Sequence, residues 1–152
     1  MTAFVMDASV TAAWLLPDQA SEHTRRLYAA IRRDEVEPQA PNAWQWECAN
    51  ILANGVRSGR IPASAVEGLW SVLDAIRHRV ELHDLAPAQH KAVLAVAIDA
   101  GVSLYDAGYL WLAKSLNLPL ATFDEHLIKA APQAGVKPVS YTHLTLPTIL
   151  LV

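Results

Sequence analysis

Two short apolar segments of this chain each end abruptly at an aspartate. Residues 2–6 stop at Asp7, and residues 119–123 stop at Asp124. Apolar runs of this length are typical of buried strands, and much of the chain between them has helical periodicity. Strands that alternate with helices predict an α/β fold, in which the carboxyl ends of parallel strands share one edge of the sheet. We therefore expect Asp7 and Asp124 to lie near each other at that edge.

The segments between these two strands carry the other predicted elements. Helices are predicted over residues 10–16, 21–33, 41–59, 62–76, 88–100 and 104–113, with a short one up to 131. Further strands are predicted at residues 36–38 and 80–82 and near 136. Ser9 and Ser103 are expected to cap the helices that follow them, and Pro41 is expected in the first turn of its helix.

Composition limits the class of protein. The chain has 152 residues, the size of one domain, and its 53% hydrophobic and 18% charged residues exclude a disordered protein. Cys48 is the only cysteine, which excludes an internal disulfide and a zinc site built from cysteines. The net charge of −3 gives no overall attraction for nucleic acid, so any binding of nucleic acid must be local.

No segment predicts export or membrane insertion. No apolar run approaches the roughly 20 residues that a membrane-spanning helix needs, and no basic residue precedes the first apolar segment. We therefore expect a cytoplasmic protein with no membrane association.

The last fourteen residues differ in character from the rest of the chain. They carry no charged side chain, and residues 139–148 (VSYTHLTLPT) read as the translation of a transposase-end adapter used to prepare sequencing libraries. We therefore predict one domain over residues 1–138, followed by a non-native tail over residues 139–152.

Four acidic residues stand out by their placement. Asp7 and Asp124 follow strands, Glu47 lies in the middle of a helix, and Asp106 lies in the first turn of another. Their sequence neighbours are mostly apolar, and a buried carboxylate is costly unless a cation or hydrogen-bond donors compensate it. Clustered carboxylates are the ligands that Mg²⁺ prefers, together with water and substrate phosphates. The four acids therefore indicate a site for phosphoryl transfer.

Taken singly, each acid also has a purely structural interpretation. Asp106 can complete a capping arrangement with Ser103, and Asp7 and Asp124 can cap the helices that follow their strands. Glu47 can pair with a nearby arginine.

The segments around the four acids resemble a known family. Residues 4–9 (FVMDAS), 46–52 (WECANIL), 104–110 (LYDAGYL) and 120–124 (LATFD) are similar to the four acidic motifs of PIN-domain ribonucleases, in order and in spacing. Within that family they most resemble VapC-like toxins of type II toxin–antitoxin systems. The resemblance covers residues 2–138 and implies a PIN-like three-layer α/β fold, with a central parallel sheet flanked by helices.

The resemblance also implies a metal-dependent endoribonuclease. The acidic cluster that would hold one or two Mg²⁺ or Mn²⁺ ions, and so carry catalysis, consists of Asp7, Glu47, Asp106 and Asp124. Bound ions would lower the pKa of a water molecule and neutralise charge on the phosphodiester. Ser9 and Thr122 match positions where the family often has a hydroxyl near the cluster, although a helix cap and a strand residue explain them equally well.

Partners follow from the resemblance as well. It implies an RNA substrate, a cognate antitoxin protein and a homodimer. Arg25, Arg57 and Arg60 are candidates for contacts with RNA phosphates, and His126 is the histidine nearest in sequence to a predicted site residue. The apolar faces of helices 21–33 and 62–76 are candidates for binding the antitoxin.

Three alternatives remain open. The first is a housekeeping or DNA-acting nuclease with the same site. The second is a phospho-accepting receiver domain, which needs adjacent acids after the first strand, where this chain has Asp7-Ala8-Ser9. The third is a binding module without catalysis.

Overall fold

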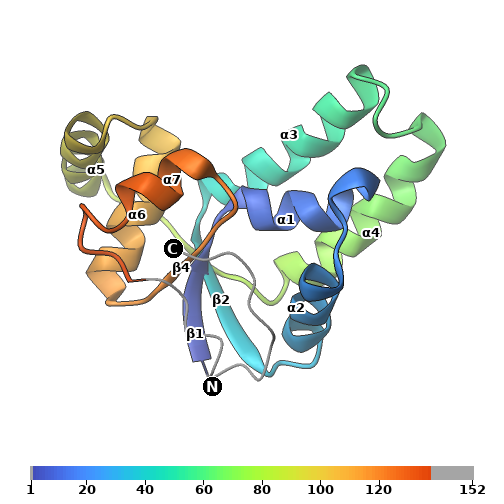
Figure 1. Cartoon of the computed structure of the whole chain (residues 1–152), viewed down its shortest axis with the longest axis horizontal. Helices are drawn as coiled ribbons and strands as arrows, with labels where there is room; N and C mark the ends of the chain where they lie inside the picture. The colour runs from blue at the N-terminus through green and yellow to red at the C-terminus, as the bar shows by residue number, and fades with distance from the viewer. Residues whose placement is uncertain (1, 138–152) are drawn as a thin grey trace.

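A computed structural model describes residues 2–137 of the chain (Figure 1). Its elements, in chain order, are β1 (Thr2–Met6), α1 (Ala8–Leu15), η1 (Pro17–Gln19), α2 (Glu22–Arg32), β2 (Val36–Pro41), α3 (Ala43–Arg57), η2 (Ala63–Ala65), α4 (Val66–Arg77), β3 (Glu81–His83), α5 (Pro87–Ala100), α6 (Leu104–Leu116), β4 (Leu120–Ala121) and α7 (Glu125–Ala130). The elements labelled η are single turns of 3-10 helix.

The described strands form one parallel sheet in the order β3-β2-β1-β4. The first strand is central because Phe4, Val5 and Met6 are buried on both faces of the sheet, as an apolar strand of a parallel sheet requires. Val5 pairs with Leu120, which brings the ends of β1 and β4 together. The predicted α/β fold with a parallel sheet is confirmed.

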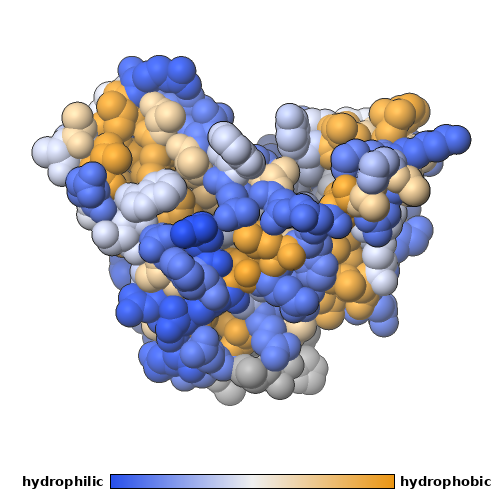
Figure 2. All heavy atoms as spheres, turned by 180° about the vertical axis from the view of Figure 1, so that it is seen from behind, coloured by the Kyte–Doolittle hydropathy of each residue, from blue (hydrophilic) through white to orange (hydrophobic). Residues whose placement is uncertain are grey.

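Helices flank the sheet on both sides and complete the three layers. Helices α1 to α4 lie on one side of β1 and β2, and α5 to α7 lie on the other (Figure 1). The amino ends of β1 and β2 lie at the bottom of this view, so their carboxyl ends point into the gap between the two groups of helices. The space-filling view shows that the surface is notched there (Figure 2). The site predicted at the carboxyl edge therefore lies beneath a notch in the surface.

Two predicted helix starts are wrong. Asp7, and not Ser9, is the N-cap of α1, because its carboxylate accepts a hydrogen bond from the Ser9 backbone N–H. Pro41 ends β2 and lies outside the helix, which begins two residues later at Ala43. The causes differ. Strand β1 ends at Met6 as predicted, so the first error lies in the choice between two residues that are both suited to a cap. Strand β2 extends beyond the predicted range to Pro41, so the second error lies in the strand boundary.

The end of the sheet also differs from the prediction. Strand β4 has two residues, and Val136 belongs to no strand within residues 2–137. The Leu120 N–H still donates a 3.2 Å hydrogen bond to the Lys137 carbonyl, so the chain returns to the edge of β4. The predicted boundary at residue 138 and the predicted tail over residues 139–152 lie outside the described residues.

The apolar faces of helices α2 and α4 are largely used inside the fold. Leu27, Ile31, Leu73 and Ile76 are all buried in the core. The prediction that these two faces are open to a partner is therefore wrong for their central residues. Trp70 of α4 stays exposed. A cavity of about 390 Å³ also lies between α1, α2 and α4, lined by Ala13, Trp14, Ala20, Arg25, Tyr28 and Val72.

Among residues 2–137, no single helix has both the length and the apolar character needed to cross a membrane. Only α5 and α6 taken together pass that test by length and composition, and they are bent by 107° at the break between them.

Candidate active site

Asp7 is held by hydroxyl groups at the end of β1. Its side chain is only 4% exposed. Oδ1 accepts a 2.6 Å hydrogen bond from the Ser9 hydroxyl, and Oδ2 accepts a 2.8 Å hydrogen bond from the Thr122 hydroxyl. Each carboxylate oxygen accepts a hydrogen bond from a side chain of a different segment, so the orientation of the carboxylate is fixed.

Ser9 and Thr122 also tie the start of α1 to the end of β4. The Ser9 and Thr122 hydroxyl oxygens lie 3.2 Å apart. The Phe123 N–H donates to the Ser9 hydroxyl at 2.8 Å, and the Asp124 N–H donates to the Thr122 hydroxyl at 2.9 Å. The two hydroxyls therefore contact one predicted site residue directly and help position the segment that carries another.

Asp124 begins α7. Its Oδ1 accepts hydrogen bonds from the backbone N–H groups of His126 at 2.8 Å and Leu127 at 3.1 Å. The prediction that Asp124 caps the helix after its strand is therefore confirmed. Within residues 2–137, Oδ2 of Asp124 accepts no hydrogen bond. One oxygen therefore serves the helix, and the other is available to a ligand.

Glu47 has a hydrogen-bond partner that the sequence analysis missed. The Tyr109 hydroxyl donates a 2.8 Å hydrogen bond to Glu47 Oε1, and Tyr109 itself is 1% exposed. Its spacing of three residues from Asp106 on the same helix could have indicated it, because residues three apart lie on one face. Within the described residues no ion pair includes Glu47, so the predicted pairing with an arginine is wrong.

Asp106 lies in the first turn of α6, as predicted. Its backbone N–H donates a 3.1 Å hydrogen bond to the Ser103 hydroxyl, which makes Ser103 the N-cap. The predicted capping arrangement with Ser103 therefore involves the backbone N–H of Asp106. It does not assign a role to the Asp106 carboxylate.

Charge repulsion links the four acids. Burial raises the pKa of Asp7 to about 7, against hydrogen bonds that lower it, and the charge of Asp124 adds to the increase. Burial also raises the pKa of Asp106, again with a contribution from Asp124. Burial raises the pKa of Glu47, where the charge of Asp106 contributes. The charge of another acid in the group thus disfavours the ionised forms of Asp7, Glu47 and Asp106.

A divalent cation suits this group of side chains. The available donors are carboxylate oxygens, which hard cations such as Mg²⁺ prefer, and a cation would offset the repulsion among them. Within residues 2–137, no three acidic, histidine or cysteine side chains are already arranged closely enough to hold one ion. Cys48 offers no soft ligand, because it is buried and burial raises the pKa of its thiol.

The three arginines proposed to contact RNA lie apart. Arg25 lines the cavity between α1, α2 and α4, and Arg60 forms a 2.7 Å ion pair with Asp18. Arg57 donates a hydrogen bond to Asn54 near the end of α3. It lies ten residues from Glu47, about 15 Å along the helix. Their placement does not support a common role at the acidic site.

Comparison with known proteins places the chain among nuclease-like sequences. Residues 4–132 match the family model of the PIN domain. Ribonuclease VapC3 from Pyrobaculum aerophilum is 30% identical to this chain over 132 residues, which cover 84% of this chain and 94% of that protein.

Solved structures share the fold. The crystal structure of PAE2754 from Pyrobaculum aerophilum aligns with a TM-score of 0.66 and 25% identity, over 95% of this chain and 88% of its own. The structure of VapC20 from Mycobacterium tuberculosis, described as a toxin that cleaves the sarcin–ricin loop, aligns with a TM-score of 0.57 and 16% identity. That alignment covers 82% of this chain and 92% of the VapC20 chain, and it bears on the fold alone.

Proposed function

The chain belongs to the PIN-domain family, with a VapC ribonuclease as a relative, and on this premise we propose that it is a divalent-metal-dependent endoribonuclease. The observation that carries the proposal is the placement of four acids from separate segments at the carboxyl edge of the sheet. The Thr122 hydroxyl contacts both Asp7 and Asp124, and a tyrosine from the helix of Asp106 contacts Glu47. The raised pKa values of three of the acids agree with this placement. Such a group is costly to the fold without a cation, so its chemistry is best explained by metal binding.

In this proposal each residue of the site has a definite task. Mg²⁺ or Mn²⁺ is held by Asp7, Glu47, Asp106 and Asp124. When bound, the ion supplies a water of lowered pKa and neutralises charge on the phosphodiester. The Ser9 and Thr122 hydroxyls orient the Asp7 carboxylate, and the Tyr109 hydroxyl orients that of Glu47.

The second part of the proposal is that the enzyme is the toxin of a toxin–antitoxin pair. The cavity between α1, α2 and α4 suits a short apolar segment of an antitoxin protein, because Trp14, Tyr28 and Val72 line it. Arg25 at its edge is in no ion pair within residues 2–137 and suits an acidic residue of that segment. As an RNA-cleaving enzyme it would act in the cytoplasm.

The third part is a homodimer that uses α5. This helix exposes Leu94 by 50% and Ile98 by 72%, and the start of α6 adds Leu104 and Tyr105. The space-filling view shows apolar surface on both lobes beside the notch (Figure 2). Large apolar side chains that share one surface are typical of an interface, and a second copy of the chain would cover them.

Cleavage of total RNA tests the proposed reaction. We expect fragments with Mg²⁺ or Mn²⁺ and none with EDTA, and no cleavage by Asp7→Asn at any metal concentration. A single-stranded DNA treated in parallel separates the RNA-acting from the DNA-acting alternative. Absence of metal-dependent cleavage of both nucleic acids would contradict the proposal and favour a binding module.

A further inference from the structure

A polar cavity opens on the α7 side of the four acids. It has a volume of about 180 Å³ and lies between α7, with the turn that follows it, and the loop that joins α5 to α6. His126, Lys129 and Gln133 form one wall, and residues 100–102 form the other. One wall therefore carries polar nitrogen groups, and the other carries small or apolar side chains.

The cavity adjoins two of the acids. The backbone N–H of His126 donates to Asp124 Oδ1 at 2.8 Å, so the first residue of this wall lies directly beside Asp124. Burial and the charge of Asp124 raise the pKa of Asp106, and the nearby His126 opposes this increase. On the opposite wall, Val102 directly precedes Ser103, the N-cap of the helix that carries Asp106. A group bound in the cavity would therefore lie next to the acidic site.

Lys129 supplies a full positive charge to this wall. It is exposed, and none of the ion pairs found within residues 2–137 includes it. Ion pairs with acidic side chains instead neutralise five arginines: Arg26, Arg33, Arg60, Arg77 and Arg79. In a chain with a net charge of −3, an unneutralised lysine beside the acids is a local attraction for an anion.

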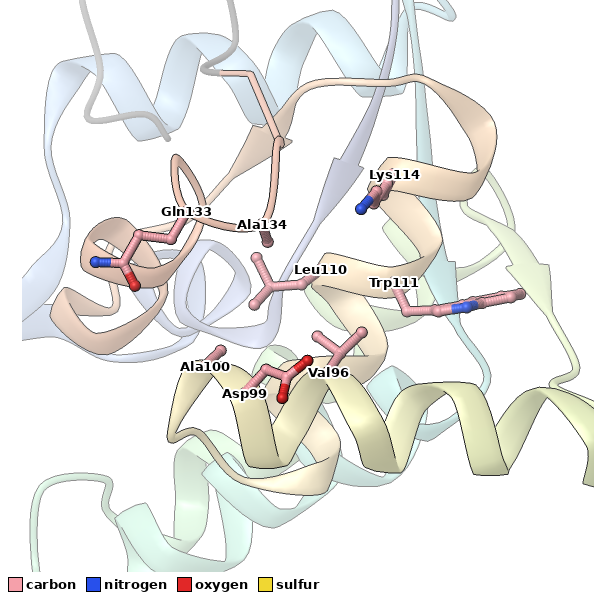
Figure 3. A pocket seen from close by; sticks show the side chains of 8 residues that line it. All are labelled: Val96, Asp99, Ala100, Leu110, Trp111, Lys114, Gln133 and Ala134. Atoms are coloured by element: carbon pink, nitrogen blue, oxygen red, sulfur yellow. The ribbon is translucent and has the colours of Figure 1, made fainter.

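A neighbouring cavity is less suited to an anion. It has a volume of about 170 Å³ and shares Ala100 and Gln133 with the first cavity. Figure 3 shows Asp99 of α5 and Lys114 of α6 at this second cavity, with Gln133 on the turn after α7. Because an acid and a base line it together, it offers an anion less than the first cavity does.

We propose that the cavity lined by His126, Lys129 and Gln133 binds a phosphate of the RNA backbone next to the phosphate that is cleaved. This inference rests on the proposed ribonuclease function and assigns to α7 the task of guiding the strand over the acids. Lysine ammonium and side-chain N–H groups are common donors to phosphate oxygens. A backbone phosphate carries no sequence information, so the contact acts on every nucleic acid strand alike.

The test measures binding separately from cleavage. The Asp7→Asn variant serves as the background in which the strand is not cut, and fluorescein-labelled single-stranded RNA of random sequence is the probe. Fluorescence anisotropy at several salt concentrations gives Kd and its salt dependence for Lys129→Gln. The matched control is Lys91→Gln, which removes the same charge from an exposed residue of α5 that lines neither cavity.

We expect Lys129→Gln to raise Kd about 5-fold and to reduce the slope of log K against log salt by about 0.7, the value for one phosphate contact on a single strand. A DNA strand of the same sequence should lose affinity equally. Lys129→Arg should restore both quantities, and Lys91→Gln should change neither. In the cleaving protein, Lys129→Gln should raise KM more than it lowers kcat.

An unchanged Kd and salt slope in Lys129→Gln, with an unfolding temperature equal to that of the background protein, would overturn the phosphate site. The proposed function fails by a different result, namely the absence of metal-dependent RNA cleavage by the wild type. If that happens and Lys129→Gln still weakens strand binding, the phosphate site stands without the nuclease.

Discussion

The Tyr109 hydroxyl donates a 2.8 Å hydrogen bond to Glu47 Oε1 and so joins α6 to α3 across the acidic site. Tyr109 is buried, which leaves its hydroxyl little access to water. A fixed donor on one carboxylate oxygen holds the other oxygen in a defined direction, as supporting hydrogen bonds do around metal ligands. Tyr109 is therefore a positioning residue for Glu47.

Tyr109→Phe tests this role. The variant keeps the packed ring and removes the donor, so we expect about 10-fold weaker Mn²⁺ binding and a loss of about 1 kcal/mol in the free energy of unfolding. Calorimetric titration with Mn²⁺ and urea unfolding measure the two effects. Tyr28→Phe is the matched control, because its hydroxyl donates to the Val72 carbonyl away from the acids. Equal Mn²⁺ affinities in both variants would leave Tyr109 with a purely structural role.

Asp7 predicts a pH dependence of stability in the metal-free protein. Its pKa is about 7 in the fold against 3.8 for an ordinary aspartate, so between these values the folded state binds more protons than the unfolded state. The contribution of Asp7 to stability is therefore lost as the pH rises from about 4 to 7. In EDTA at pH 8, we expect Asp7→Asn to be more stable than the wild type by on the order of 3 kcal/mol.

Urea unfolding at pH 5 and pH 8 checks this prediction. The advantage of Asp7→Asn should shrink at pH 5, where the wild-type carboxyl group is largely protonated, and added Mn²⁺ should reverse it at pH 8. A difference between the two proteins that is the same at both pH values would contradict the assignment of a raised pKa to Asp7.

The predicted non-native tail gives a third test. Deletion of residues 140–152 should leave the unfolding temperature and the metal-dependent cleavage of RNA unchanged, because the PIN-domain match ends at residue 132. Thermal unfolding of the full chain and of the shortened chain measures this. A shortened chain that no longer folds would show that the tail is part of the domain.

The sequence patterns predicted where strands end and which acids follow them, because both features can be recognised from neighbouring residues in the sequence. Apolar runs that stop at Asp7 and Asp124 predicted two strand ends at one edge of a parallel sheet, and β1 and β4 are neighbours there. Ser103 was correctly predicted as a cap, because this hydrogen bond joins residues only three apart in the sequence.

The missed features depend on contacts between distant segments. Tyr109 and Glu47 are 62 residues apart, and only the fold, in which α3 and α6 both contact β2, makes them partners. Ser9 was expected to cap a helix, but its hydroxyl bonds with Asp7 and accepts a hydrogen bond from Phe123, 114 residues away. The arginines chosen for RNA were selected by charge alone, and charge does not reveal that Asp18 neutralises Arg60.

Asp106→Asn tests the central claim that the four acids form one metal site. The substitution keeps the size of the side chain and removes one charge. If Asp106 only contributes to the first turn of α6, the loss of its charge should destabilise the protein by about 0.3–1 kcal/mol. If it belongs to the cluster, the relief of repulsion from Asp124 and Glu47 should raise the unfolding temperature in EDTA by about 3 °C. Glu67→Gln, an exposed first-turn acid of α4, is the matched control and should destabilise slightly.

The decisive measurement is the unfolding temperature of Asp106→Asn in EDTA and with increasing Mn²⁺, compared with the wild type. Our account predicts a higher unfolding temperature than the wild type in EDTA and a much smaller increase on addition of Mn²⁺. A lower unfolding temperature in EDTA, together with an undiminished increase with Mn²⁺, would remove Asp106 from the site and contradict the four-carboxylate account.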